Sequence, residues 1–470
     1  MTLAVERPAA LNGSETAAPQ AFPAGTTWAV ICLAVEAGTL KEIEGEWREG
    51  PLPDAFGARD GAPPEPFTPE DRSKYYGSDV SSLLYGTSSI SKRYHRDISL
   101  FAGARRDRAA DGSPEDPTVH HIGLERMRLR VGRVHVEILM VHLAVVSHRG
   151  LPASSGDRDL AVLESMLNAE SMEEILPSEL INLMLPGVVL DPQTQPWFTL
   201  LRTAPNKDFT LARRGAANGS SPRDAAVTVD LANERKPVVV RLSTSWDMEV
   251  GPRGVGFTLH AEDRDSDPAF HDTKAPARVR SVSSDKVLLV FLQEILLSRL
   301  SARAAAVQLP GDRATTEDLE AVQTLLAEVA TFYAKVWWSS TGRGGKRDTD
   351  FVTMQAQWDL RERLGDLVAI SEGLRNVLST RVLQRTQHSQ VALSWALAAV
   401  AALAVPQTVL SALQSASPAA RSHFHGLLAP SALVWFAFTM AGLVLLALLG
   451  FLAYAGSLRL RASRTPASLP

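Results

Sequence analysis

Three short stretches of the sequence combine residue types that bind metals or phosphate. The first is an acidic segment at residues 262–267, which is followed by His271 and Asp272. Counted from its second residue, a calcium-binding loop requires glycine at the sixth position and glutamate at the twelfth, where this chain has Pro268 and Lys274. The pattern therefore favours a solvated turn, and a loose divalent-cation sensor is the alternative.

The other two stretches contain only part of a binding motif. His120 and His121 are adjacent, and adjacent side chains on a strand point to opposite faces rather than toward one metal ion. Residues 342–346 are glycine-rich and end in lysine, but Arg347 stands where a phosphate-binding loop requires serine or threonine, so we interpret them as a basic turn. Without a nucleophile elbow, a zinc-ligand pair or a catalytic cysteine signature, the sequence predicts neither an enzyme nor a bound cofactor or metal.

Residues 74–85 combine tyrosines with a lysine, and a group of basic residues follows them in the chain. That group consists of Lys92, Arg93, Arg96, Arg105 and Arg106. Interleaved aromatic and basic side chains are typical of surfaces that bind anions or nucleotides. The alternative is a partly ordered segment that packs its tyrosines against a sheet. The net charge of the chain is −4, which gives no general attraction for nucleic acid.

The clearest strand pattern is a pair of alternating segments, residues 124–131 and 134–146, separated by Gly-Arg. Alternation on both sides of a two-residue turn that contains glycine predicts an antiparallel hairpin. The first strand carries a stripe of arginines on one face, namely Arg126, Arg128 and Arg130. This arginine stripe either binds a small anionic ligand or forms a solvated sheet face, and the position of His135 and Glu137 relative to it depends on the strand register.

The N-terminal part of the 470-residue chain is expected to be an α+β or α/β cytoplasmic domain with a mixed sheet and long loops, at residues 26–280. Residues 28–35 form a continuous apolar run, which indicates a strand covered on both faces. The run contains Cys32, the single cysteine, which excludes an internal disulfide and fits a reducing compartment. Residues 1–25 have little apolar surface and no signal-peptide pattern, so we predict a disordered leader.

Residues 281–390 are predicted to be a helical stalk region. Ser284 and Asp285 are expected to cap a helix that runs to about residue 307, and Gln293 marks it as a buried helix rather than a membrane span. Farther along, an imperfect coiled-coil seam contains Leu360, Leu364, Leu367, Ser371, Leu374 and Leu378. Residues 350–413 are expected to form one helical column, whose leucines are covered by the preceding helices or by further copies of the chain.

Residues 391–413 carry no charge and match the about 20 residues that cross a bilayer, so they are the first predicted transmembrane helix. A loop at 414–430 and a second transmembrane helix at 431–457 follow, and a basic tail at 458–470 ends the chain. Basic residues concentrate before the first span and after the second. The positive-inside rule therefore places both termini in the cytoplasm and the loop outside an inner, or cell, membrane.

Small and polar residues recur in the first predicted span. Ser394, Ala398 and Ala402 are spaced by four residues and form a narrow face that allows close helix packing. Pro406 frees a backbone carbonyl, and polar side chains follow it. The complete candidate set is Ser394, Ala398, Ala402, Pro406, Gln407, Thr408 and Ser411. These residues either line a pore or bond across a helix interface in a membrane anchor.

The predicted layout is a cytoplasmic domain, a helical stalk continuous with the first span, a short external loop, a second span and a basic tail, and it resembles that of the CorA-type magnesium transporters. The resemblance lies in topology, because the Gly-Met-Asn tripeptide of that family does not occur at residues 408–420 and no filter residue is transferred. It implies a homo-oligomer, a pentamer in that family, with the first span innermost.

Two functions follow as hypotheses. The first is an oligomeric ion conduit controlled by a cytoplasmic sensory domain. The second is a membrane-anchored effector of a bacterial signalling or defence system, which senses a small anionic ligand or a protein partner without conducting ions. Membrane lipid and further copies of the chain are the expected partners in both, and a membrane-tethered enzyme is the third and least supported class.

Overall fold

The computed structural model describes residues 26–36, 47–56, 65–98, 105–107, 117–146, 162–163, 165–204, 238–243, 245–251, 253–260, 270–307, 316–341, 348–415 and positions 435, 439 and 442. The chain divides into two compact units, of which the first comprises residues 1–306 and 324–370 and the second residues 307–323 and 371–470. The helices that the sequence assigned to a stalk are therefore divided between the two units.

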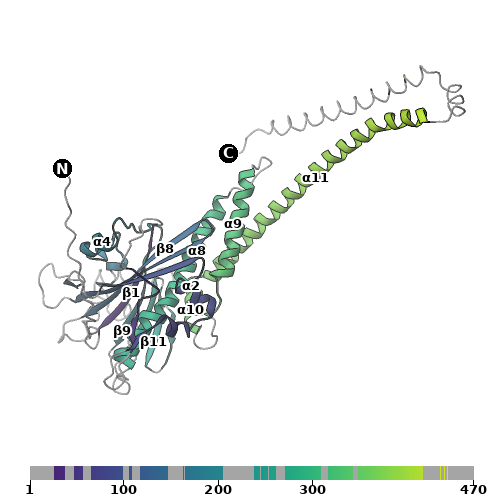
Figure 1. Cartoon of the computed structure of the whole chain (residues 1–470). Coiled ribbons are helices and arrows are strands. Elements are labelled where there is room, and N and C mark those ends of the chain that lie inside the picture. The colour runs from purple at the N-terminus through teal and green to yellow at the C-terminus, as the bar shows by residue number, and fades with distance from the viewer. Residues whose placement is uncertain are drawn as a thin grey trace, which may run out of the picture. The chain divides into compact units, whose positions relative to one another are not determined.

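The first unit contains a ten-stranded sheet (Figure 1). Its strands are β1 Thr27–Val35, β2 Arg48–Glu49, β5 Ser91–Asp97, β6 Arg105–Asp107, β7 Thr118–Val131, β8 Val134–Val146, β9 Trp197–Ala204, β10 Val238–Arg241, β11 Trp246–Gly251 and β12 Gly254–His260. They follow the order β10-β11-β12-β9-β1-β8-β7-β5-β2, with β6 paired to β7. β9 and β12 are parallel and the other pairs antiparallel, which confirms the predicted mixed sheet and the α+β class.

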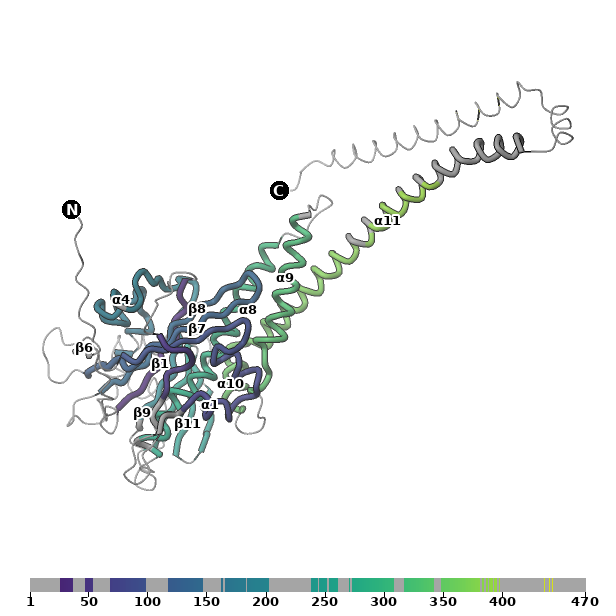
Figure 2. Tube along the Cα trace, viewed as in Figure 1, coloured from purple at the N-terminus to yellow at the C-terminus, as the bar shows by residue number. Residues whose placement is uncertain are grey.

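The two strand predictions with the strongest patterns are confirmed. β1 lies between β8 and β9 and is buried on both faces, as its continuous apolar run indicated. β7 and β8 form the predicted antiparallel hairpin, and Figure 2 shows them side by side. A register shift between His121 and Gly123 moves the alternation of β7 by one residue. Strands β2, β5, β6, β9 and β11 of this sheet were not predicted. A separate small sheet pairs β3 Asp54–Phe56 with β4 Glu65–Phe67.

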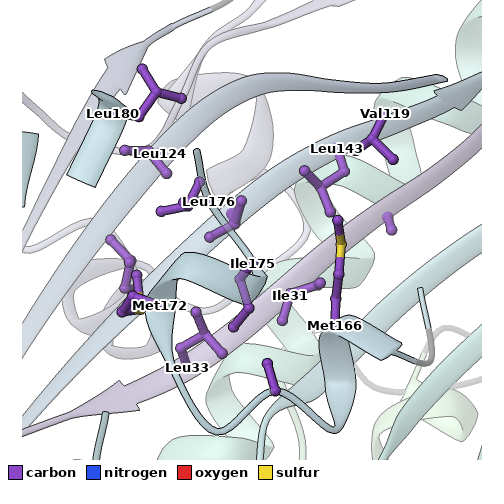
Figure 3. Packing of buried hydrophobic residues seen from close by; sticks show 14 of the residues in the cluster. Ile31, Leu33, Val119, Leu124, Leu143, Met166, Met172, Ile175, Leu176 and Leu180 are labelled. Atoms are coloured by element: carbon purple, nitrogen blue, oxygen red, sulfur yellow. The ribbon is translucent and has the colours of Figure 1, made fainter. Parts of the chain in front are cut away.

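One face of the sheet is covered by a helical segment that contains a 3-10 turn, Met172–Glu174, and α4, Ser178–Met184. Alternate residues of β1 and β8 pack against this segment in the apolar core that Figure 3 shows. Labelled examples in that view are Ile31, Leu33, Leu143, Met166, Met172, Ile175 and Leu176. The segment at 172–185 is thus a 3-10 turn followed by a short helix.

The opposite face is covered by a continuous helical run, made of a π-helical segment Phe270–Lys274, α7 Ala275–Arg278, a second π-helical segment Val279–Ser283 and α8 Ser284–Ala306. On this side the guanidinium of Arg280 lies 4.7 Å from the ring centre of Trp28. The prediction that Ser284 and Asp285 cap a helix is wrong, because the backbone is already helical before them and the Ser284 hydroxyl donates to Val279 O at 2.6 Å.

The prediction that α8 is a buried helix is confirmed. Its polar Gln293 is fully buried and donates to Val336 O at 3.0 Å, while its side-chain oxygen accepts from Gln355 Nε2 at 2.9 Å. These bonds join α8 to the end of α9, Thr316–Lys335, and to α10, Thr349–Gln357. Two short helices, α1 Pro69–Ser73 and α2 Ser78–Leu84, complete the helices of the described first unit.

The predicted single column over residues 350–413 is two helices. α10 ends at Gln357, and α11 runs over Leu360–Ser415. Between them Asp359 has a φ of 51°, a left-handed conformation that interrupts the helical hydrogen bonds. Four of the predicted seam residues are buried within one chain, and these are Leu360, Leu364, Leu367 and Leu374. Farther along α11 the described side chains of Leu383, Val391, Leu393 and Leu397 are exposed.

Residues 391–413 lie in α11 and have a helical backbone. Within the described part of the chain, no helix combines the length and hydropathy of a membrane span. The predicted leader at 1–25, the loop beyond residue 415, the second span at 431–457 and the tail at 458–470 lie outside the described residues, except for helical positions 435, 439 and 442.

Candidate anion-binding site

Strand pairing brings together two basic segments that are distant in the sequence. β5 pairs with β7, which places Lys92 directly opposite Arg128. β7 pairs with β8, which places Arg128 opposite Glu137 and Arg130 opposite His135. Directly opposed residues on neighbouring strands present their side chains on the same face. The arginine stripe, Lys92 and Glu137 therefore share one face of the sheet.

These side chains border an open depression of about 390 Å³, here called the basic depression. Its polar lining residues are Ser89, Ser91, Lys92, Arg128, Arg130, His135 and Glu137. Its volume is at the lower end of the roughly 300–1,000 Å³ of small-molecule sites. Lys92, Arg130 and His135 are exposed, whereas Glu137 is buried.

Glu137 is shared by two arginines of the stripe. Its Oε1 accepts from Arg128 Nε at 2.6 Å and from Arg126 Nη2 at 3.3 Å. Burial and then the neighbouring charge of Arg128 lower the pKa of Arg126, whereas the ion pair with Glu137 raises it. Among the described residues no carboxylate forms an ion pair with Lys92 or Arg130. Lys92 and Arg128 lie directly opposite each other, an arrangement of like charges that destabilises a sheet, and the ion pair of Arg128 with Glu137 offsets part of this cost.

The hairpin that carries the basic depression is fixed by helices of the same unit. Glu328 of α9 accepts a hydrogen bond from the Arg133 backbone N–H at 2.7 Å and pairs with Arg303 of α8. Arg299 of α8 donates to the His135 carbonyl and pairs with Asp191 at 2.7 Å. These contacts hold one edge of the depression in place, and none of them involves the side chain of Lys92, Arg128 or Arg130.

The basic group that follows residues 74–85 does not act as a unit. Lys92 lines the basic depression, whereas Arg93 is fully buried on the other face of β5. The side chains of Arg105 and Arg106 lie outside the described part of the chain. Of the tyrosines in 74–85, Tyr76 and Tyr85 are buried and Tyr75 is half-buried, and Tyr76 donates to Val282 O of the helical segment at 2.6 Å.

Arg93 belongs to a second, fully buried charge cluster beneath α8. It donates to Glu125 at 2.6 Å and to Asp285 at 2.8 Å, and Glu125 also contacts His142 Nε2 at 2.8 Å. Burial opposes the charged form of Glu125, but the charge of Arg93 and the hydrogen bond from His142 hold its pKa below its usual range. Arg72 lies 3.5 Å from Asp285. The cluster joins α1, β5, β7, β8 and α8 through buried ion pairs, so we assign it a structural role.

The metal and nucleophile candidates gain no support. His121 contacts the Ile175 carbonyl at 3.0 Å, and no group of three metal-binding side chains occurs in the described residues. The acidic segment 262–267 and the basic turn 342–346 lie outside them, as do the side chains of His271 and Asp272. Burial raises the pKa of the Cys32 thiol to about 12, which makes it a poor nucleophile.

The seven candidate pore or helix-interface residues all lie on α11. Ser394 is exposed and its hydroxyl donates to Gln390 O at 2.8 Å. The side chains of the other six positions, Ala398, Ala402, Pro406, Gln407, Thr408 and Ser411, lie outside the described part of the chain. The pore and anchor interpretations therefore both stay predictions. No protein family matches this sequence, and no curated protein and no solved structure is significantly similar to it.

Proposed function

We propose that this chain is a membrane-anchored receptor whose α+β domain binds a small anion in the basic depression. In this proposal α11 links the domain to a two-helix transmembrane hairpin at 391–413 and 431–457. The protein lies in the inner membrane with both termini in the cytoplasm, and it is a homo-oligomer. The observation that supports the binding function best is the convergence of Lys92, Arg128 and Arg130 around one depression.

Anchoring in a bilayer is supported by a change in burial along α11. The seam leucines as far as Leu374 are covered within one chain, but Leu383, Val391, Leu393 and Leu397 are each 54–63% exposed. Exposed apolar side chains in succession are expected to contact lipid or another protein. The uncharged run at 391–413 has the length of a span, so lipid is the simplest partner for its apolar side chains.

The anion-binding function is tested by isothermal titration calorimetry of the full chain in detergent with inorganic phosphate. Phosphate is expected to bind, and a Lys92→Gln, Arg130→Gln double variant is expected to lose at least about tenfold in affinity, because each charge-assisted hydrogen bond contributes roughly 1.5–3 kcal/mol. Lys335→Gln, which removes an exposed lysine on α9, is the matched control. Equal affinity in the double variant and the control would refute the site.

Membrane insertion is tested by carbonate extraction and flotation of the chain with liposomes. The full chain is expected to stay with lipid. Leu393→Arg with Leu397→Arg is expected to release it, because arginine in a span costs about 2.5–3.5 kcal/mol per residue by insertion scales. Recovery of the unaltered chain in the soluble fraction without detergent would overturn the anchoring proposal.

Ion conduction is the second candidate function. It is supported by the continuity of α11, a single helix from Leu360 through the first predicted span, as in the CorA-like layout. Ion flux into liposomes is expected to differ between the unaltered protein and Gln407→Leu if this residue lines a conduit. Equal flux in both, or none, leaves an effector of a bacterial signalling or defence system, which senses its ligand without conducting ions.

A further inference from the structure

We infer that the ligand of the basic depression is a small phosphomonoester that carries a hydroxyl or N–H group close to its phosphate, as sugar phosphates and nucleoside monophosphates do. This inference rests on the proposed anion-binding function and specifies its ligand class. It depends on three features, which are the arrangement of the cations, the carboxylate oxygen of Glu137 that has no hydrogen-bond partner among the described residues, and the size of the depression.

The cations favour phosphate over carboxylate. Lys92 comes from β5, and Arg128 and Arg130 come from alternate positions of β7, and all three line the same depression. A planar carboxylate is satisfied by a single bidentate arginine, whereas a tetrahedral dianion accepts hydrogen bonds from several sides. Three cations around one depression therefore suit a terminal phosphate group.

Glu137 requires a hydrogen-bond donor. Its side chain is 8% exposed and lines the depression, and Oε1 accepts from both Arg126 and Arg128. Its Oε2 is buried and has no hydrogen-bond partner within the described residues. A buried acceptor without a partner is unfavourable. An anion would be repelled by this carboxylate, whereas a hydroxyl or N–H group of the ligand would donate a hydrogen bond to it.

The depression is larger than a bare phosphate ion needs. Its volume is 390 Å³, whereas one water molecule in the liquid takes up only about 30 Å³, so the depression holds a ligand much larger than a few water molecules. Ile90 and the neighbouring exposed Ser89 border the same space and offer an apolar contact and a hydroxyl. A ligand with a phosphate at the cations and a polar body over Glu137 would fill it.

The test compares methyl phosphate, which has no hydroxyl group on its carbon, with ribose 5-phosphate, using calorimetry on the full chain in detergent. The unaltered protein is expected to bind ribose 5-phosphate about tenfold more tightly, the effect of one hydrogen bond to a charged group. Glu137→Gln is expected to weaken ribose 5-phosphate binding by a similar factor. The same variant should bind methyl phosphate equally well or better, because it removes a negative charge.

Equal binding of the two probes by the unaltered protein would overturn this inference and leave the proposed function in place. Binding of neither probe at millimolar concentration would refute both. Equal weakening of both probes in Glu137→Gln would mean that Glu137 only positions the arginines, which also overturns the inference. Lys92→Gln serves as a second variant and should weaken both probes equally. AMP then distinguishes the two sources, since tighter binding than ribose 5-phosphate assigns a nucleotide and equal binding assigns a sugar phosphate.

Discussion

At the scale of single residues, neighbouring basic side chains have different roles because their burial and their partners differ. Arg93 and Lys92 are neighbours in β5, yet Arg93 is fully buried between Glu125 and Asp285 whereas Lys92 is exposed at the basic depression. A buried ion pair is costly to form but more costly to break, because removing one partner leaves an uncompensated charge. Arg93 is therefore a structural residue, and Lys92 is available to a ligand.

Glu125→Gln is expected to destabilise the first unit by about 3–5 kcal/mol at pH 7, because Arg93 and His142 lose a buried anionic partner. The folded-state pKa of Glu125 is lowered, so its stabilising contribution is complete above the unfolded-state pKa of about 4.3 and decreases as the pH falls below it. The variant should therefore lose less stability than the unaltered protein on acidification.

Urea unfolding followed by tryptophan fluorescence at pH 7 and at lower pH measures both effects. The exposed Glu179→Gln on α4 is the control, since it removes a carboxylate without a buried partner. If Glu125→Gln is as stable as this control at pH 7, the buried cluster does not contribute as described.

At the scale of elements, the β7–β8 hairpin is the part that connects the candidate site to the helices. Its turn glycine, Gly132, has a φ of 59°, and a Cβ there would lie 2.4 Å from Cγ of Glu328. Glycine therefore serves both the backbone conformation and the close approach of α9. Arg299 and Arg303 of α8 hold the same hairpin, so α8 and α9 together position the basic depression.

Gly132→Ala is expected to destabilise the first unit by about 1–3 kcal/mol, because it adds a clash with Glu328 to the cost of a left-handed conformation. Gly187→Ala separates the two effects. Gly187 has a φ of 75°, and no atom lies within 4 Å of the place that a Cβ would take, so its substitution has only the backbone cost. Equal losses in midpoint of urea unfolding for the two variants would show that the contact with α9 is not needed.

At the scale of the whole molecule, α11 changes its environment along its length. Leu360 and Leu367 are fully buried within one chain, whereas Leu383 is 63% exposed before the uncharged run begins. In the proposed membrane protein this exposed leucine lies outside lipid and is expected to contact α11 of another copy. The coiled-coil pattern in the sequence predicts that the leucines are buried. It does not show whether helices of the same chain or those of a second copy bury them.

Leu383→Glu is expected to reduce the oligomeric state of the full chain in detergent, because a carboxylate at a helix contact repels its equivalent in the neighbouring copy. Light scattering should give a multiple of 50.8 kDa for the unaltered protein and a smaller mass for the variant. Ser389→Glu, on a different face of the same helix, is the control. A monomer in every case would contradict the proposed oligomer.

The sequence alone determined the features that depend on local patterns. Period-two alternation predicted the β7–β8 hairpin and the shared face of Arg126, Arg128 and Arg130, and a continuous apolar run predicted β1. Polar interruptions such as Gln293 predicted that α8 is a buried helix. Each prediction depends on residues close together in the chain, because the direction of a side chain repeats with the period of its own element.

Only the tertiary structure decided which distant segments meet. The pairing of Lys92 with Arg128 joins two strands across intervening loops, and no local pattern sets that register. The same pairing turns Arg93 to the opposite face, where Asp285 serves as its ion partner instead of a helix cap. The candidate site therefore results from non-local strand pairing. Alternation within a strand assigns its residues to the two faces of the sheet, but it does not show which other strand lies beside it.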